Sequence, residues 1–191
     1  GARVTLVERS FMLGGLATSG LVTIYLPICD GMGRQVSFGI AEELLRLSIE
    51  HGWEAVNEKY KCPDIWLEEH SVKERRESGK RYGVQFNPHL FVFSIERVLL
   101  ELGVKILYGS YVSAVSESDG RIDAVIIESK SGREAISVKK CVVDATGDCD
   151  IAHFSGAPTE QFRQGNVLAG WYYSTGKNAY NLSIVGYADI P

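Results

Sequence analysis

Residues 1–20 read GARVTLVERSFMLGGLATSG and contain the two features that decide the fold. The first is a β-rich run, Val4 to Val7, that ends directly at Glu8. A carboxylate at the tip of the second strand of a dinucleotide-binding βαβ unit accepts hydrogen bonds from ribose hydroxyls. The second is a glycine-dense run over residues 13–20. Together they indicate an α/β nucleotide-binding fold, although a strand ending in Glu also suits an ordinary exposed carboxylate.

The glycine-dense run contains Gly14 and Gly15, at a separation from Glu8 that lets a loop fold back across a bound cofactor. Small residues allow the backbone to approach a ligand closely. Backbone N–H groups in such a loop can serve a phosphate or the N5/O4 edge of a flavin. The alternative is a tight turn that starts a helix, with Thr18 and Ser19 as caps.

Periodicity and turn signals place the remaining elements. Helices are predicted over 38–51, closed by Gly52, and over 91–102, after the start signal Asn87-Pro88. Residues 68–78 suit a solvated helix or a surface excursion. A strand is expected at 104–107, and two turn signals divide the next segment into a three-stranded antiparallel meander. The meander strands are predicted at 111–116, 122–128 and 135–138, and further strands at 170–174 and 182–187.

A third feature follows the meander, in the sequence VVDATGD at 142–148. An apolar strand over 141–144 would end at Ala-Thr-Gly, which places a glycine turn at the carboxyl edge of the sheet, where open α/β folds bind ligands. Asp148 and Asp150 are expected to cap a helix that begins near Ile151.

Composition limits the function. The chain has 191 residues, 45% of them hydrophobic, and a net charge of −4, so it lacks the basic surface that nucleic-acid binding requires. The sequence shows no apolar run of about 20 residues and no signal pattern, which predicts a soluble protein without a membrane partner. Cys29, Cys62, Cys141 and Cys149 show no metal-ligand spacing; they predict reduced thiols, no metal site and a cytoplasmic location.

Taken together, GARVTLVER, LGGLATSG, GRQVSFGIAEEL and VVDATGDCDIAHFSGAP resemble the FAD-dependent oxidoreductases of the FAD_oxidored type, which belong to the two-dinucleotide-binding-domain flavoproteins. The resemblance covers residues 1 to about 165. It implies FAD as cofactor and hydride transfer between the flavin and a small organic substrate that the sequence does not identify. It also implies the site: Glu8 at the adenosine ribose; Arg9, Gly14, Gly15, Ala17 and Thr18 at the pyrophosphate and isoalloxazine; the backbone of Val112 at adenine; Ala145, Thr146 and Gly147 close to the dinucleotide, with Asp148 nearby. No catalytic residue is assigned.

The chain departs from the family pattern at both ends. The G-x-G-x-x-G turn with its helix and the later Gly-Asp segment are missing, so we expect a truncated fragment of an α/β protein, a Rossmann-like sheet with a meander but without its first βα unit. Residues 1–157 would be a partial FAD-binding domain, with the meander at about 110–140, and 158–191 the start of a β-rich substrate domain. Such a chain should bind FAD weakly or not at all.

The opening strand would then have its usual neighbour upstream of Gly1, and its unpaired edge would favour self-association. Two alternatives remain for the function. One is an NAD-binding Rossmann dehydrogenase, which the meander disfavours because such a domain would continue with βα units. The other is a non-catalytic scaffold or interaction domain derived from a flavoprotein.

Overall fold

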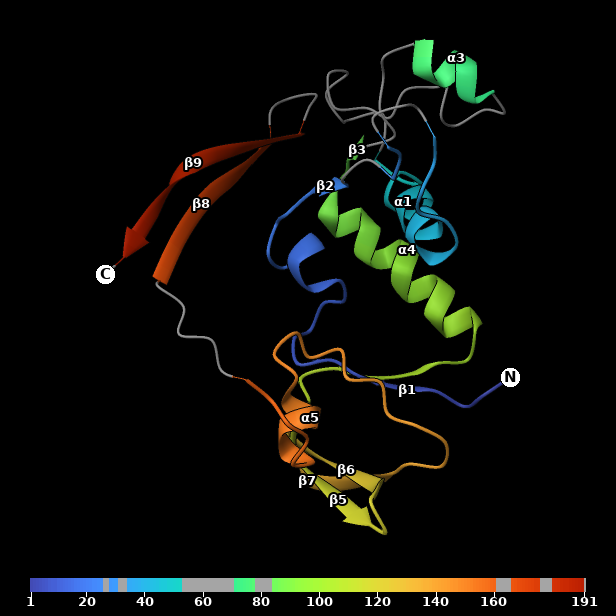
Figure 1. The fold of residues 1–191 in the computed structure, drawn as a ribbon, viewed down its shortest axis with the longest axis vertical. Helices are drawn as coiled ribbons and strands as arrows, with labels where there is room; N and C mark the ends of the chain where they lie inside the picture. The colour runs from blue at the N-terminus through green and yellow to red at the C-terminus, as the bar shows by residue number, and fades with distance from the viewer. Residues whose placement is uncertain are drawn as a thin grey trace. The chain divides into compact units, whose positions relative to one another are not determined.

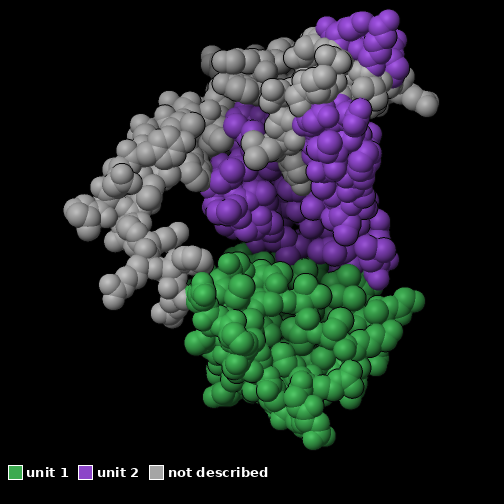
Figure 2. Space-filling view, viewed as in Figure 1, with its two compact units in different colours: residues 1–11, 103–165 green, residues 12–102, 166–191 purple. Residues whose placement is uncertain are grey.

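A computed structural model describes most of the chain, and its residues fall into two compact units (Figure 2). Unit 1 comprises residues 1–11 and 103–165, and unit 2 comprises residues 12–102 and 166–191. The structure describes residues 1–25, 28–30, 34–52, 71–77, 84–160, 166–175 and 180–190. Because the units are separate bodies, each is described by itself.

A parallel pair of strands opens unit 1. Strand β1 (Thr5–Val7) pairs with β4 (Lys105–Leu107), so that Leu6 lies opposite Ile106. The amide of Glu8 continues the ladder by donating to the Leu107 carbonyl at 2.9 Å. The parallel pairing expected of an α/β sheet is confirmed. The expectation that the neighbour of β1 lies upstream was incomplete, because the strand that pairs with it in this structure is β4, about a hundred residues downstream.

The antiparallel meander is confirmed (Figure 1). Strands β5 (Tyr111–Ser118), β6 (Arg121–Ser129) and β7 (Gly132–Ser137) form one sheet in that order. The first hairpin turns at Asp119 and Gly120, both with positive φ, which is the backbone of a type I′ turn and explains the Asp-Gly signal. Val125 and Ile127 of β6 are buried, as is Ile151 of the short helix α5 (Asp150–Phe154), which contacts β5.

The strand expected at 141–144 is wrong: these residues form no strand. Val143 is 79% exposed. A strand needs hydrogen bonds from a neighbouring strand, and in the described part of the chain none pairs with this segment. An apolar run alone therefore did not suffice to form a strand here.

Unit 2 is built around two helices, α1 (Ile40–Ser48) and α4 (Pro88–Glu101), which confirm the helices expected in these regions. The Asn87 side chain caps α4 by accepting from the amides of His89 at 3.0 Å and Leu90 at 3.3 Å, as the Asn-Pro signal indicates. Leu45, Phe86 and Phe91 are buried in its core. Arg97 of α4 binds both carboxylate oxygens of Glu50, just beyond α1, at 2.7 and 2.8 Å.

In the part of unit 2 that the structure describes, four shorter elements and a hairpin accompany these two helices. The 3₁₀ helix η1 spans Gly15–Ala17, β2 (Ile24–Tyr25) pairs antiparallel with β3 (Val84–Gln85), and α3 spans Val72–Glu77. Ser71 and Glu74 form a capping box at the start of α3. Strands β8 (Asn166–Thr175) and β9 (Tyr180–Ile190) form a long antiparallel hairpin, which confirms strands where 170–174 and 182–187 were predicted. The boundary expected at 157/158 stays a prediction.

Candidate functional site

The first part of the candidate site is the turn that follows β1 in unit 1. The Glu8 carboxylate lies at the end of the parallel strand pair and accepts a hydrogen bond from the Ser10 amide at 2.7 Å. The Glu8 carbonyl accepts from the Ser110 amide at 3.1 Å, and the Ser10 carbonyl accepts from the Gly109 amide at 3.0 Å. Backbone pairing with β4 and the residues after it thus fixes the position of Glu8. Arg9, the next predicted site residue, is exposed.

The second part is the Ala-Thr-Gly segment, also in unit 1. Ala145, Thr146, Gly147 and Asp148 are all exposed, and Gly147 has φ +89° with no atom within 4 Å of the place where a Cβ would stand. The backbone at Gly147 is therefore open to close approach by a ligand, because no side chain covers it.

Asp144 holds this segment in place. Its Oδ1 accepts from the Thr146 amide at 3.1 Å and from the Thr146 hydroxyl at 2.8 Å, and its Oδ2 accepts from the Ala152 amide at 3.1 Å. The Thr146 hydroxyl oxygen accepts from the Asp150 amide at 3.0 Å. Partial burial raises the pKa of Asp144, but the donors on Thr146, Ala152 and Ile151 outweigh it, so the pKa lies below its ordinary value.

The expected caps of α5 were therefore wrong. The N-cap residue is Cys149, in the left-handed conformation with φ 60°, and its side chain makes no capping hydrogen bond. Asp144 and Thr146 bind the amides at the start of α5 in place of Asp148 and Asp150. Sequence reasoning missed Asp144, although the spacing Asp-x-Thr is a signal for a side chain that binds the backbone two residues on.

Replacing Asp144 by alanine is expected to lower the stability of unit 1 by about 1 kcal/mol, the typical effect of losing a cap. Hydrogen exchange at the Asp150 and Ala152 amides would show the loss locally. The Asp144→Asn variant is the matched control, because its side chain has one carbonyl oxygen and can accept only some of these hydrogen bonds. Since the folded pKa is depressed, the advantage of wild type over Asp144→Asn should be complete well above pH 3.8 and should vanish as the pH falls through the folded pKa. A pH-independent difference would contradict this assignment.

The third part, the glycine-rich turn, belongs to unit 2. Gly14 has φ +100° and accepts from the Ala17 amide at 3.0 Å, which starts η1. A Cβ on Gly14 would lie 2.6 Å from Cγ2 of Thr18. Thr18 is fully buried, and its hydroxyl donates to the Leu13 carbonyl. The Thr18 side chain thus serves the turn itself, whereas Gly15 is exposed and has open space around its Cα.

The predicted site residues divide between the two units. Glu8, Arg9, Ala145 and Asp148 belong to unit 1, as do Val112, on β5 opposite Ile127, Thr146 and Gly147. Gly14, Gly15, Ala17 and Thr18 belong to unit 2. Contact of each of these residues with a cofactor stays a prediction.

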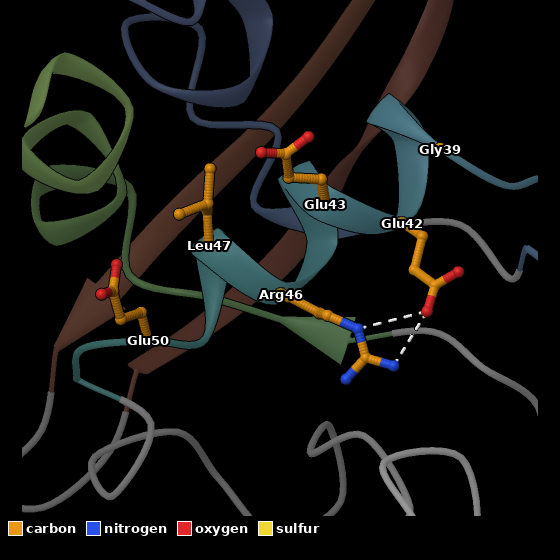
Figure 3. Close-up of a pocket in the computed structure, with 6 residues that line it drawn as sticks. All are labelled: Gly39, Glu42, Glu43, Arg46, Leu47 and Glu50. Atoms are coloured by element: carbon orange, nitrogen blue, oxygen red, sulfur yellow. Dashed lines mark hydrogen bonds and ion pairs between the residues drawn. The ribbon is translucent and has the colours of Figure 1, made fainter. Parts of the chain in front are cut away.

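A hollow of about 480 Å³ lies beside helix α1 in unit 2 (Figure 3) and was not expected from the sequence. Arg46 turns toward Glu42 and donates to it through Nη2 at 2.8 Å. Three carboxylates and one guanidinium line the hollow, and Arg97 pairs with one of the three, Glu50. The net charge around the hollow stays negative and disfavours the pyrophosphate of a dinucleotide, so we do not assign this hollow to a dinucleotide cofactor. The residues that line it are Gly39, Glu42, Glu43, Arg46, Leu47 and Glu50.

Other chemistry is limited within the described residues. They hold no group of three or more His, Cys, Asp or Glu side chains placed to bind a metal ion. Cys29, Cys141 and Cys149 are free thiols, and Cys62 lies outside the described residues. None of the helices in the described ranges has the length and apolar character needed to cross a bilayer.

Comparison with known proteins defines the class. The family model for FAD dependent oxidoreductases matches residues 1–170, which is most of the chain. The chain therefore belongs to the FAD-dependent oxidoreductase family, and the resemblance expected from the sequence is confirmed. FAD as the cofactor of the whole protein is confirmed with it, and the NAD-dependent alternative loses its support.

Among solved structures, the chain is similar to THI4 of Thermovibrio ammonificans, with 17% identity and a TM-score of 0.45. The match covers 81% of this chain and 52% of that one, so the chain spans about half the length of the structure it matches. A similarity this low carries no argument about function. No curated protein sequence matches the chain significantly.

Proposed function

We propose that this chain supplies the ribose-binding and flavin-contacting parts of an enzyme that transfers hydride between FAD and a small organic substrate. The observation that carries the proposal is the pair of ligand-compatible features in unit 1: a carboxylate fixed at the end of a parallel strand pair, and an exposed Ala-Thr-Gly turn whose glycine has open space around it. Open α/β sheets bind ligands at the carboxyl ends of their strands, which is where Glu8 lies.

The residues present fit FAD. Glu8 would accept hydrogen bonds from the adenosine ribose, since a carboxylate is an acceptor with several lone pairs. Gly147 would let the dinucleotide pass close to the backbone, and Asp144 would keep that turn in one conformation. When bound, the isoalloxazine ring supplies the redox chemistry, while the protein orients the substrate and tunes the ring.

The 191 residues contain no G-x-G-x-x-G sequence. We propose that in the whole polypeptide this turn and its helix precede Gly1, and that their N–H groups and helix dipole bind the pyrophosphate. The chain alone would then lack the largest electrostatic feature of the cofactor site.

The test compares the 191-residue chain with a chain extended upstream in the native polypeptide. We expect the short chain to purify colourless, or to bind FAD weakly in titrations, and the extended chain to carry the visible absorption bands of a bound flavin. Stoichiometric FAD on the short chain would contradict the proposed role of the upstream segment. An extended chain that folds but stays colourless with added FAD would favour the scaffold function.

Self-association is proposed on a separate observation. In the described residues, β1 pairs with β4 on one edge only, and a two-stranded parallel sheet is rare in isolation. A strand from a second copy of the chain could pair with the second edge of β1 and so cover that edge. Light scattering should show dimers or larger species for the short chain, and a strict monomer would exclude this pairing.

A further inference from the structure

Phe11, at the end of the turn that follows β1, is an aromatic side chain left open to solvent. It is 79% exposed. An aromatic ring in water keeps a large apolar surface that a partner could cover with a gain in free energy. Single exposed apolar side chains are common on protein surfaces, so exposure by itself assigns no role to Phe11. Its surroundings decide whether the exposed ring can bind a ligand.

The ring of Phe11 lies with its edge against the backbone of Gly109. A Cβ at Gly109 would stand 2.7 Å from Cζ and 2.8 Å from Cε1 of Phe11, so any larger residue there would push the ring aside. The Gly109 amide also donates to the carbonyl of Ser10, the residue before Phe11, at 3.0 Å. Unit 1 therefore supports the ring at one edge, while most of its surface stays accessible.

The contact between Phe11 and Gly109 joins the two segments of unit 1 that hold the residues expected at the adenosine. Phe11 lies three residues after Glu8, and three residues of chain span at most about 10 Å. Gly109 lies three residues before Val112, whose backbone is expected at the adenine. The Ser110 amide donates to the Glu8 carbonyl at 3.1 Å, so the two segments are also hydrogen-bonded to each other. The ring thus stands within reach of a base whose ribose binds to Glu8.

We propose that the Phe11 ring is the face on which the adenine ring of the dinucleotide stacks. A base and an aromatic side chain attract each other when they stack, and both lose apolar surface to water on contact. Hydrogen bonds from the backbone of β5 would bind only the edge of the base, so its face needs a separate partner. A phosphate or a sugar would gain little from a phenyl ring, which favours the base as the occupant. This inference rests on the proposed function.

The test uses Phe11→Ala and Phe11→Trp in the form of the protein that binds FAD. Alanine removes the stacking face, so FAD and ADP, which share the adenosine, should both bind about 5- to 100-fold more weakly. Tryptophan keeps an aromatic face, so Phe11→Trp should bind both ligands within a few-fold of wild type. ADP should also quench the emission of the new tryptophan. Because Phe11 is exposed, neither variant should change the stability of the protein in urea.

Gly109→Ala tests the position of the ring without removing it. Its Cβ would push the ring aside, and FAD and ADP should bind at least about fivefold more weakly, the lower end of a stacking contribution. Gly120→Ala is the matched control in the same unit, because Gly120 also has positive φ, +70° against +59° at Gly109. No atom lies within 4 Å of the place of its Cβ, so this variant should keep FAD affinity within a few-fold of wild type.

Unchanged affinity for FAD and ADP in Phe11→Ala would overturn the inference. A loss of self-association in light scattering at the same time would identify a second copy of the chain as the occupant of the ring. Equal weakening by Phe11→Ala and Phe11→Trp would overturn it as well, because the aromatic face would then not matter. A wild-type protein that binds neither FAD nor ADP would instead remove the proposed function, and this inference with it.

Discussion

Replacing Gly14 by alanine is expected to destabilise unit 2 by about 2 to 5 kcal/mol. The backbone at Gly14 has φ +100°, which costs a residue with a Cβ about 1 to 2 kcal/mol or more. The new Cβ would also lie 2.6 Å from Cγ2 and 2.8 Å from Oγ1 of Thr18. Thr18 is fully buried, so it has little room to move, and overpacking of this kind adds about 1 to 3 kcal/mol. Urea unfolding followed by circular dichroism would measure the change.

Gly15→Ala is the matched control for this effect. Gly15 also has positive φ, at +50°, but no atom lies within 4 Å of the place of its Cβ. Only the backbone cost of about 1 to 2 kcal/mol applies. Equal destabilisation by the two substitutions would show that the contact between Gly14 and Thr18 does not define the turn.

The glycine-rich turn illustrates how far the sequence could lead. Gly14 and Gly15 were both predicted to line a ligand because small residues permit close approach. The structure separates them: a side chain of the protein itself excludes any Cβ at Gly14, whereas Gly15 faces open space. Two adjacent glycines look alike in the sequence. Only the position of the Thr18 side chain in the folded structure distinguishes their roles.

Sequence signals predicted the structure correctly where the contacting residues are close together in the chain. The meander strands β5 and β6 join at Asp119 and Gly120, so the turn residues themselves determine the pairing. The α4 cap at Asn87 is likewise contained in two residues. Pairing between distant segments was harder: β4 was predicted as a strand but not as the partner of β1. Residues 141–144 have strand composition, but whether a strand forms depends on a neighbour, which composition does not encode.

The two side chains that sequence reasoning missed differ in kind. Asp144 could have been found, because an Asp side chain in a turn commonly accepts from the backbone amide two residues on, which here is that of Thr146. Phe11 could not, since a phenylalanine next to Ser10 carries no sign that its ring stays 79% exposed beside Gly109. The exposure of an apolar side chain is a property of the folded unit.

Replacing Glu8 by alanine is expected to weaken FAD binding by about 100-fold, since hydrogen bonds to a charged acceptor contribute about 1.5 to 3 kcal/mol each. ADP binding should weaken by the same factor, because the adenosine ribose is common to both ligands. Equilibrium titration of FAD fluorescence and calorimetry with ADP would give both affinities.

The Glu8→Gln variant distinguishes the role of the Glu8 charge in ligand binding from the role of its side-chain oxygen in the turn. Its amide oxygen can still accept from the Ser10 amide, as the Glu8 Oε1 does at 2.7 Å, but the negative charge is gone. The pairing of β1 with β4 uses only backbone groups at Glu8, so neither variant should lose the parallel strands. We expect Glu8→Gln to fold like wild type and to bind FAD about tenfold more weakly, between wild type and Glu8→Ala. Wild-type affinity for FAD and ADP in Glu8→Ala would exclude this carboxylate from the ribose site, and the dinucleotide would then have to be held elsewhere in the fold.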